Sequence, residues 1–499
     1  MKYLKIITAL ILIGSIAGTG CKKSWLDVND DPNRVTDENI TPDLLFIQSA
    51  TAAGARQASN NFRFVEHWMG YWSPPGDFAI EQDETSYNID FSFGDALWQN
   101  HYGVLFDLKL AKDKALATGD SCLAGAAMIL SAKLFQELVD IYGNIPYSQA
   151  FNNDQYRQPV YDNAAEIYAS LQERLDSAII YMSVDAPKSS FETTDVINHG
   201  DQVLWIKFAN TLKLRMLIRQ SETPGFDPSG EIDKIVNYFG TLQEGENIMV
   251  NPGYVNDNNK QSPFYANYGN TPAGVDAATS TRANAYYVNL LSSTGDPRLS
   301  RIFRPTSGTF VGAVYGASTG NPFGTASSRL GPGLAGSASQ DAWIYPAFEA
   351  MFLEAEATAR GWIDGDAQEI YERAVTESFV FLNKDNEDGD PEAEAADYLS
   401  SVDIAKWSNA GSSVESQAKF ITYQKYIALG GVDPLEAWSD LRRLNMIPDK
   451  GYISANPSRL SNSLPVRLLY PQSEYTTNAD NVNAQGTINQ FTSKLFWQP

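Results

Sequence analysis

Aromatic side chains gather around a short proline turn, and their mixture with polar residues suits the recognition of sugars. The turn is Ser73-Pro74-Pro75-Gly76-Asp77, and around it stand Trp68, Tyr71, Trp72, Phe78, Tyr87 and Trp98. The apolar face of a sugar ring stacks on Trp or Tyr, while Asp, Asn and Gln exchange hydrogen bonds with its hydroxyls. Full burial of one large aromatic is worth roughly 4 to 6 kcal/mol. Two aromatic rings, each partly covered by a stacked sugar, would give dissociation constants of about micromolar to millimolar, a range that suits capture followed by release.

These aromatics divide into predicted core residues and predicted ligand contacts. We expect Trp68 and Trp98 to be buried, since both lie in predicted helices. We expect Trp72, which stands beside the prolines, and Tyr87 to be exposed. The predicted ligand-binding set is therefore Trp72, Tyr71 and Tyr87, with Tyr265, Tyr268 and Tyr315 as weaker candidates further along the chain.

A second chemical signal is Cys21, which follows an export signal. Lys2 and Lys5 form a basic start, and the apolar run over 6–18 is too short to span a bilayer. Gly18, Thr19 and Gly20 place small residues before Cys21, as a lipoprotein signal peptidase requires, although Leu is more usual at the position of Gly18. We predict that 1–20 is a lipoprotein signal peptide and that Cys21 carries the lipid of a membrane anchor.

Catalytic signals are weak, and we predict no catalytic residue. Gly316-Ala317-Ser318-Thr319-Gly320 fits the G-x-S-x-G pattern of serine hydrolases, but no helix-forming segment follows it. The hydrolase order also needs a histidine downstream, whereas the three histidines are His67, His101 and His199. A glycoside hydrolase needs only two suitably separated carboxylates, so that alternative stays open in a chain this rich in acids.

Metal and cofactor signals are similarly weak. Asp27, Asn29 and Asp31 alternate as in a calcium loop, and 385–390 (DNEDGD) is acidic, but neither keeps the EF-hand spacing. We interpret both as solvated loops and predict no metal and no cofactor, with structural calcium as an unsupported possibility. Cys122 is expected to be a buried apolar residue. With Cys21 acylated, the two cysteines of the chain leave no disulfide.

Helical periodicity predicts a mainly α fold, and its arrangement as four antiparallel helix pairs rests partly on the family resemblance given below. The first two pairs are expected over 96–117 with 121–142 and over 162–182 with 201–220. The third follows Phe348, Met351, Phe352, Ala355 and Ala359 on one apolar face, with Gly361 as its cap and Asp366 at the start of the next helix. Stacked helix pairs of this kind are typical of tetratricopeptide-like repeats.

The fourth pair is predicted within Ile421 to Arg443 (ITYQKYIALGGVDPLEAWSDLRR). Phe420, Tyr423 and Ile427 share one helical face. Gly430 is expected to adopt the left-handed conformation that ends the helix. Asp433 then supplies an N-cap, Pro434 the first helical position, and Glu436 the second half of a capping box.

Between the helical segments 96–220 and 343–445, the amino-acid composition of 221–340 is dominated by Gly, Asn, Ser, Thr and Pro. A region this long without helical periodicity is typical of functional loops, here with a few short strands.

The formal charge of the whole chain is −23, from 37 Lys plus Arg and 60 Asp plus Glu. Such a surface repels phosphate backbones, so nucleic acid is excluded as a partner. No linker divides 21–499, which we predict to be one domain.

Several segments resemble conserved segments of one known family, and they follow one another along this chain in the same order as in that family. Leu138 to Ala150 (LVDIYGNIPYSQA) is similar to its LYGDIPYSEA segment, and Trp205 to Arg219 (WIKFANTLKLRMLIR) to its W-x-K-F-A-N helix. The others are Ile421 to Arg443, Ala347 to Gly361 (AFEAMFLEAEATARG), Arg467 to Asn483 and Thr492 to Trp497. The sequence is thereby identified as a member of the SusD/RagB family of nutrient-binding outer-membrane lipoproteins.

The resemblance implies a non-catalytic receptor. It implies a tetratricopeptide-like scaffold whose loop-rich insertion forms the ligand face, and a glycan ligand handed to a SusC-like TonB-dependent transporter. It also implies attachment to the outer membrane through the lipid on Cys21, with the protein facing the cell exterior. Lys22 and Lys23 depart from the acidic export tags common in related bacteria. Peptide capture is the alternative of the same architecture, and a purely structural transporter subunit is a third.

Overall fold

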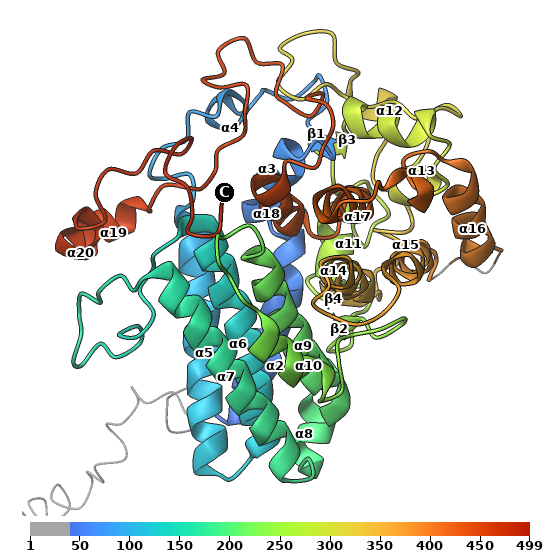
Figure 1. Ribbon diagram of the computed structural model, residues 1–499. Helices are drawn as coiled ribbons and strands as arrows, with labels where there is room; N and C mark the ends of the chain where they lie inside the picture. Colours follow the sequence, from blue (N-terminus) through green and yellow to red (C-terminus); the bar gives the residue numbers. More distant parts are fainter. Residues whose placement is uncertain (1–39, 385, 387) are drawn as a thin grey trace, which may run out of the picture. The chain divides into compact units, whose positions relative to one another are not determined.

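Helices make up most of the chain, and the computed structural model describes residues 40–384, 386 and 388–499 (Figure 1). The predicted signal peptide 1–20 and the predicted lipidation site Cys21 lie outside the described residues, as do Asp27, Asn29 and Asp31. Residues Pro42–Pro499 form one compact unit, which is described below.

Four long helices form the first part of this unit, and each packs on the helix that follows it. They are α5 (Asp95–Ala117), α6 (Ser121–Tyr142), α7 (Ala164–Val184) and α9 (Gln202–Arg219), with α2 (Pro42–Ala55) against α5. The side chains of Asp120, Asn163 and Asp201 cap the N-termini of α6, α7 and α9, as expected for Asp and Asn at this position. The first two predicted helix pairs are confirmed.

The second group of helices lies toward the C-terminus and contains the third and fourth predicted pairs. It consists of α14 (Ala347–Ala359), α15 (Ala367–Asn383), α16 (Pro391–Ser401), α17 (Val414–Ala428) and α18 (Pro434–Leu444). Gly361 follows α14 with a φ of 73°, and Asp366 caps α15, as predicted. The mainly α, helix-pair fold class is therefore confirmed.

Two details of the turn between α17 and α18 differ from the prediction. Gly431, with a φ of 80°, takes the left-handed conformation, and not Gly430. Gly430 is required for space instead, because a Cβ there would lie 2.5 Å from the Tyr287 hydroxyl. Asp433 caps α18 by accepting from the Glu436 amide at 3.2 Å, but the Glu436 side chain does not return to the cap. It pairs with Lys425, because buried cations bind a carboxylate more strongly than a backbone amide does.

Helix α6 is the core helix of the first group. Among the described residues it is the one helix long and apolar enough to cross a membrane, and 94% of its most apolar window is buried inside the protein. A long, mostly apolar helix that is covered by other helices is a core helix. Cys122, in its first turn, is buried with 1% of its surface exposed, as predicted.

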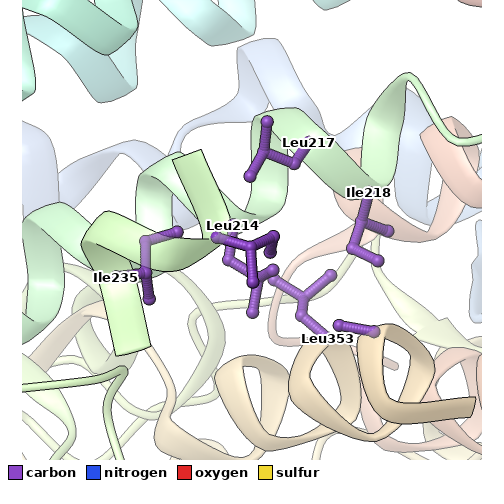
Figure 2. Packing of buried hydrophobic residues seen from close by; sticks show 7 residues of the cluster. Leu214, Leu217, Ile218, Ile235 and Leu353 are labelled. Atoms are coloured by element: carbon purple, nitrogen blue, oxygen red, sulfur yellow. The ribbon is translucent and has the colours of Figure 1, made fainter. Parts of the chain in front are cut away.

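An apolar cluster joins the two groups of helices (Figure 2). Leu214, Leu217 and Ile218 lie on one face of α9 and meet Leu353 of α14 and Ile235 of the short helix α10 (Ser229–Val236). Burying each of these side chains contributes about 1.5 to 3 kcal/mol. The cluster therefore stabilises the docking of α9 on α14.

A buried network of charges joins the same helices, and the family-like segments supply it. Arg219 of α9 and Lys425 of α17 both pair with Glu436 of α18. Arg443 of α18 pairs with Glu356 of α14 at 2.6 Å. Burial alone would raise the pKa of Glu356, but the charges of Arg443 and Arg360 lower it to about 2. These segments thus position helices and do not line a surface.

The region 221–340 is loop-rich with short helices and strands, as predicted. Its helices after α10 are α11 (Pro263–Tyr268), α12 (Ala285–Ser293) and α13 (Leu299–Ile302), with a 3-10 turn η3 (Gly324–Ala326). Strand β3 (Arg282–Ala283) pairs antiparallel with β1 (Trp72–Ser73). Strand β2 (Ile248–Val250) pairs antiparallel with β4 (Ala342–Tyr345), with a register shift after Ile248.

The remaining elements are short. They are η2 (Arg56–Ala58), α3 (Asn60–Trp68), α4 (Gln82–Ser86), α8 (Ser189–Thr194), η4 (Trp407–Asn409), α19 (Gln472–Thr477) and α20 (Ala479–Asn483). Helix α3, strand β1 and helix α4 follow one another, and β1 lies beside β3 of the insertion (Figure 1).

Candidate ligand-binding cleft

Five of the six predicted ligand contacts are buried. The predicted exposure of Trp72 and Tyr87 is wrong, because neither side chain has measurable solvent exposure. Tyr71, Tyr268 and Tyr315 are buried as well, and only Tyr265 is partly exposed. Trp68 and Trp98 are core residues, as predicted. None of the five presents a ring face to a ligand in this structure.

Long-range packing is the reason that Trp72 is buried beside a proline turn. Its strand pairs with β3, more than 200 residues away in the sequence, and this pairing turns the indole into the protein. The Trp72 ring packs 4.9 Å from Tyr268 and 6.3 Å from Phe264, measured between ring centroids. The prolines bend the chain only after this strand.

A hydrogen-bonded layer beneath the surface connects α4 to the loop that follows Val314. The Tyr315 hydroxyl donates to Glu84 Oε1 at 2.9 Å, and His67 Nδ1 lies 2.7 Å from the same oxygen. Burial would raise the pKa of Glu84, but His67 and the hydrogen bonds outweigh it and lower the pKa. Tyr87 accepts a hydrogen bond from the Ser454 amide at 2.7 Å. Tyr315 therefore ties its loop to α4, and Tyr87 ties the end of α4 to the segment at Ser454.

A cleft of about 560 Å³ lies between the proline turn and the loop over 316–323. Phe78 on one side is 40% exposed and Phe323 on the other is 65% exposed. The cleft is lined by Ser73, Pro74, Pro75, Gly76, Phe78, Ala79, Ile80, Gln82, Gly316, Ala317, Ser318, Thr319, Gly320, Asn321 and Phe323. Two exposed rings therefore stand among hydroxyl and amide groups.

Direct hydrogen bonds hold the two sides of the cleft together. The Gly76 amide donates to the Pro322 carbonyl at 2.8 Å, and the Gly324 amide donates to Asp77 Oδ1 at 2.8 Å. A Cβ at Gly76 would lie 2.3 Å from the Asn321 carbonyl oxygen, so only glycine permits this approach.

Asn321 closes the second loop with its own side chain. The Val314 amide donates to Asn321 Oδ1 at 2.8 Å, and Asn321 Nδ2 donates to the Val314 carbonyl at 2.9 Å. Gly316, with a φ of 76°, lets the chain pass against Ser454, and the Ala455 amide donates to the Tyr315 carbonyl at 2.8 Å. Hydrogen bonds within the protein therefore hold both loops in place before any ligand binds.

Comparison with known proteins identifies the fold and the family. A family model described as starch-binding and associating with the outer membrane matches residues 32–471. The chain belongs to the SusD-like family. The resemblance stated from the sequence motifs is confirmed, and the family is one of nutrient-binding proteins associated with the outer membrane. Among proteins with curated descriptions, none matches the sequence.

Solved structures of other SusD-like proteins share the fold. A SusD homologue from Bacteroides fragilis is 21% identical, with a TM-score of 0.73 over 92% of this chain and 99% of its own. A chitin-binding SusD homologue from Flavobacterium johnsoniae is 21% identical, with a TM-score of 0.72 over 90% of this chain and 98% of its own. A SusD homologue from Bacteroides vulgatus is 23% identical, with a TM-score of 0.71 over 89% and 92%.

The cleft of this SusD-like protein offers binding groups and few catalytic ones. None of its described lining residues is a carboxylate, a histidine or any other charged side chain. Ser318, the serine of the G-x-S-x-G pattern, lies in an exposed loop that no helix follows directly. Among the described residues, no group of three or more His, Cys, Asp or Glu side chains is placed to hold a metal ion.

Neither exposed ring of the cleft was in the predicted ligand-binding set: Phe78 was named only as part of the aromatic cluster, and Phe323 was not selected. Phe323 is a single aromatic among turn formers, in Asn-Pro-Phe-Gly, and the same signal also selected Tyr268 and Tyr315, which are buried. Pattern alone does not separate a ring that faces solvent from one that packs under a loop. The sequence pattern does not show which loops lie against each other in the folded protein.

Proposed function

We propose that this SusD-like protein captures a neutral oligosaccharide in the cleft between Phe78 and Phe323 and delivers it to a TonB-dependent transporter. The observation that carries the proposal is the pair of exposed phenyl rings in an uncharged cleft that also presents the exposed polar side chains of Gln82, Ser318 and Thr319. Aromatic faces stack on sugar rings, and uncharged polar groups bind hydroxyls at low desolvation cost.

The same lining disfavours the two alternatives. A peptide brings charged termini and side chains, and the described lining residues include no charged partner for them. A glycoside hydrolase needs two carboxylates flanking the bond, and the lining offers none. The chitin-binding homologue from Flavobacterium johnsoniae supports a neutral glycan and suggests chitin oligosaccharides as the first probe.

The anchor and the partner are part of the proposal. An acylated Cys21 would hold the protein at the outer membrane, facing the exterior, beside a SusC-like transporter. The preceding small residues and the family's association with the outer membrane support this arrangement.

Titration calorimetry with soluble chitin and malto-oligosaccharides tests the binding site. We expect Phe323→Ala and Phe78→Ala each to weaken binding of the preferred glycan by about tenfold, or about 1.4 kcal/mol. Phe106→Ala is the matched control, because Phe106 is 46% exposed on α5 and does not line the cleft. An anionic oligogalacturonate should bind more weakly than the neutral glycans. Equal affinity of both phenylalanine variants and the parent protein, or release of shorter products, would contradict the proposal.

A further inference from the structure

A second cavity, of about 200 Å³, lies between the neighbouring helices α5, α6 and α7 and the loop over 147–151. It shares no lining residue with the cleft. Its charged lining residues are Lys109 and Lys112 of α5 and Arg174 of α7, and none of its described lining residues is an Asp or a Glu. This lining is unusual in a chain with a formal charge of −23. A cavity of roughly 150 Å³ is large enough to hold one benzene ring.

Arg174 is held in place, but it has no carboxylate partner among the described residues. Its guanidinium lies 5.1 Å from the centroid of the Tyr147 ring and 5.7 Å from that of Phe135, and Nη1 donates to Ser131 Oγ at 3.1 Å. The side chain is partly exposed, and none of its nitrogens is both buried and without a partner. Because a guanidinium carries five N–H donors, accessible donors remain for a ligand.

The two lysines add positive charge that nearby acids only partly balance. Lys109 Nζ and Lys112 Nζ lie 2.8 and 3.0 Å from the carboxylate of Asp113, and the two lysine side chains are 41% and 33% exposed. Asp162 accepts three hydrogen bonds from residues 147–148 of the loop. Together with the guanidinium on α7, three cations therefore stand against two carboxylates that do not line the cavity and are already hydrogen-bonded.

Phe151 contributes an apolar wall in a strained conformation. Its φ is 67°, a value that bulky residues rarely adopt. Its ring centroid lies 5.9 Å from that of Phe106 and 6.4 Å from that of Phe135. Strained residues persist where the surrounding packing fixes them, and they gather at binding sites. Leu105 and Met128 extend the apolar part of the lining.

We propose that this cavity binds a small aromatic carboxylate. The planar guanidinium of Arg174 matches the two oxygens of a carboxylate, and Lys109 and Lys112 add attraction over a longer range. The aromatic ring of the ligand lies against Phe151 and Met128, since apolar and aromatic walls suit a single ring of this size. The site is separate from the glycan cleft, and the proposal does not rest on the glycan function.

Calorimetry at pH 7 with benzoate, benzamide and acetate tests the two requirements of the site. Benzamide has nearly the shape of benzoate without its charge, and acetate has the charge without the ring. We expect saturable binding of one benzoate per protein and at least tenfold weaker binding of each of the other two. Binding of benzamide or acetate as tight as that of benzoate, or no binding of benzoate, would overturn the proposal.

A matched pair of arginine substitutions tests the role of the guanidinium. Arg174→Gln should weaken benzoate binding by at least tenfold. Arg157→Gln removes the same charge at an exposed position that does not line the cavity, and it should leave binding unchanged. Equal weakening in both variants would indicate a general effect of net charge and contradict the assignment.

Two substitutions at Ala150 test the location even if Arg174→Gln fails to fold. Ala150 is a partly exposed lining residue in the loop. Ala150→Trp should fill the cavity with an indole and abolish benzoate binding, whereas Ala150→Ser should retain it. Phe323→Ala, in the glycan cleft, should leave benzoate binding unchanged. Retained binding in Ala150→Trp would place benzoate elsewhere and overturn the assignment.

Discussion

Tyr71 and Tyr426 hold each other's chain segments by reciprocal hydrogen bonds. The Tyr71 hydroxyl donates to the Tyr426 carbonyl at 2.6 Å, and the Tyr426 hydroxyl donates to the Met69 carbonyl at 2.8 Å. Their rings stack with centroids 5.0 Å apart and an interplanar angle of 23°. The pair ties the segment before the proline turn to helix α17, and the Tyr71 ring is buried in this contact.

Removal of one hydroxyl of this pair should lower stability without removing a ligand contact. Tyr426→Phe leaves the buried Met69 carbonyl without its tyrosine donor, and we expect a loss of about 1 to 3 kcal/mol in the free energy of unfolding. Urea denaturation measures it. Tyr265→Phe, at a partly exposed ring, is the control and should change stability by less than about 0.5 kcal/mol. A Tyr426→Phe variant as stable as the parent protein would show that the hydrogen bond contributes nothing net.

The close approach of Gly76 to Asn321 should affect both ligand affinity and stability. Gly76→Ala places a Cβ 2.3 Å from the Asn321 carbonyl oxygen, so the two loops must separate. We expect glycan binding to weaken by at least tenfold in calorimetry, with a loss of stability of about 1 to 3 kcal/mol. Gly230→Ala, in helix α10 where a Cβ meets no atom, should leave binding unchanged and raise stability slightly. Unchanged binding in Gly76→Ala would place the ligand outside the cleft.

Glu356 should make the folded protein sensitive to acid. Its pKa is about 2 in the folded protein and 4.5 without these partners, so its contribution is complete above about pH 5 and falls as the pH drops through that interval. The loss should reach about 2 kcal/mol at pH 3.

The measurement is denaturant unfolding of the parent protein and Glu356→Gln at pH 7, 5 and 3. The variant should be less stable at pH 7 by about 3 to 5 kcal/mol, because Arg443 loses its buried partner, and the gap should narrow toward pH 3. Glu173→Gln, at an exposed position, makes the same change of charge and should leave the pH dependence of stability unchanged. A gap that stays constant with pH would refute the assignment.

Lipid attachment at Cys21 can be tested independently of ligand binding. Cys21→Ser removes the thiol that the acyl chain requires, so the protein should lose incorporation of labelled palmitate and leave the membrane fraction. Cys122→Ser is the control, since Cys122 is buried in α6 and should not affect labelling. Equal palmitate labelling of the Cys21→Ser variant and the parent protein would exclude this anchor.

Local signals in the sequence determined the helices, their pairing and the family. Periodic apolar faces and capping residues such as Asp366 and Asp433 act within a few residues, so they can be read from the chain directly. The exception in the α17–α18 turn is informative. Gly430 and Gly431 both permit a left-handed conformation, and the Tyr287 ring packed against Gly430 shows why the first is required for space.

Only the tertiary structure decided which aromatic rings are exposed to solvent. Trp72 and Phe323 both lie within two residues of a proline, yet the first is buried and the second is 65% exposed. The difference arises from contacts between distant segments, the pairing of β1 with β3 and the approach of Gly76 to Pro322. Burial of a side chain is a property of everything packed around it, whereas a sequence pattern reports only its nearest neighbours along the chain.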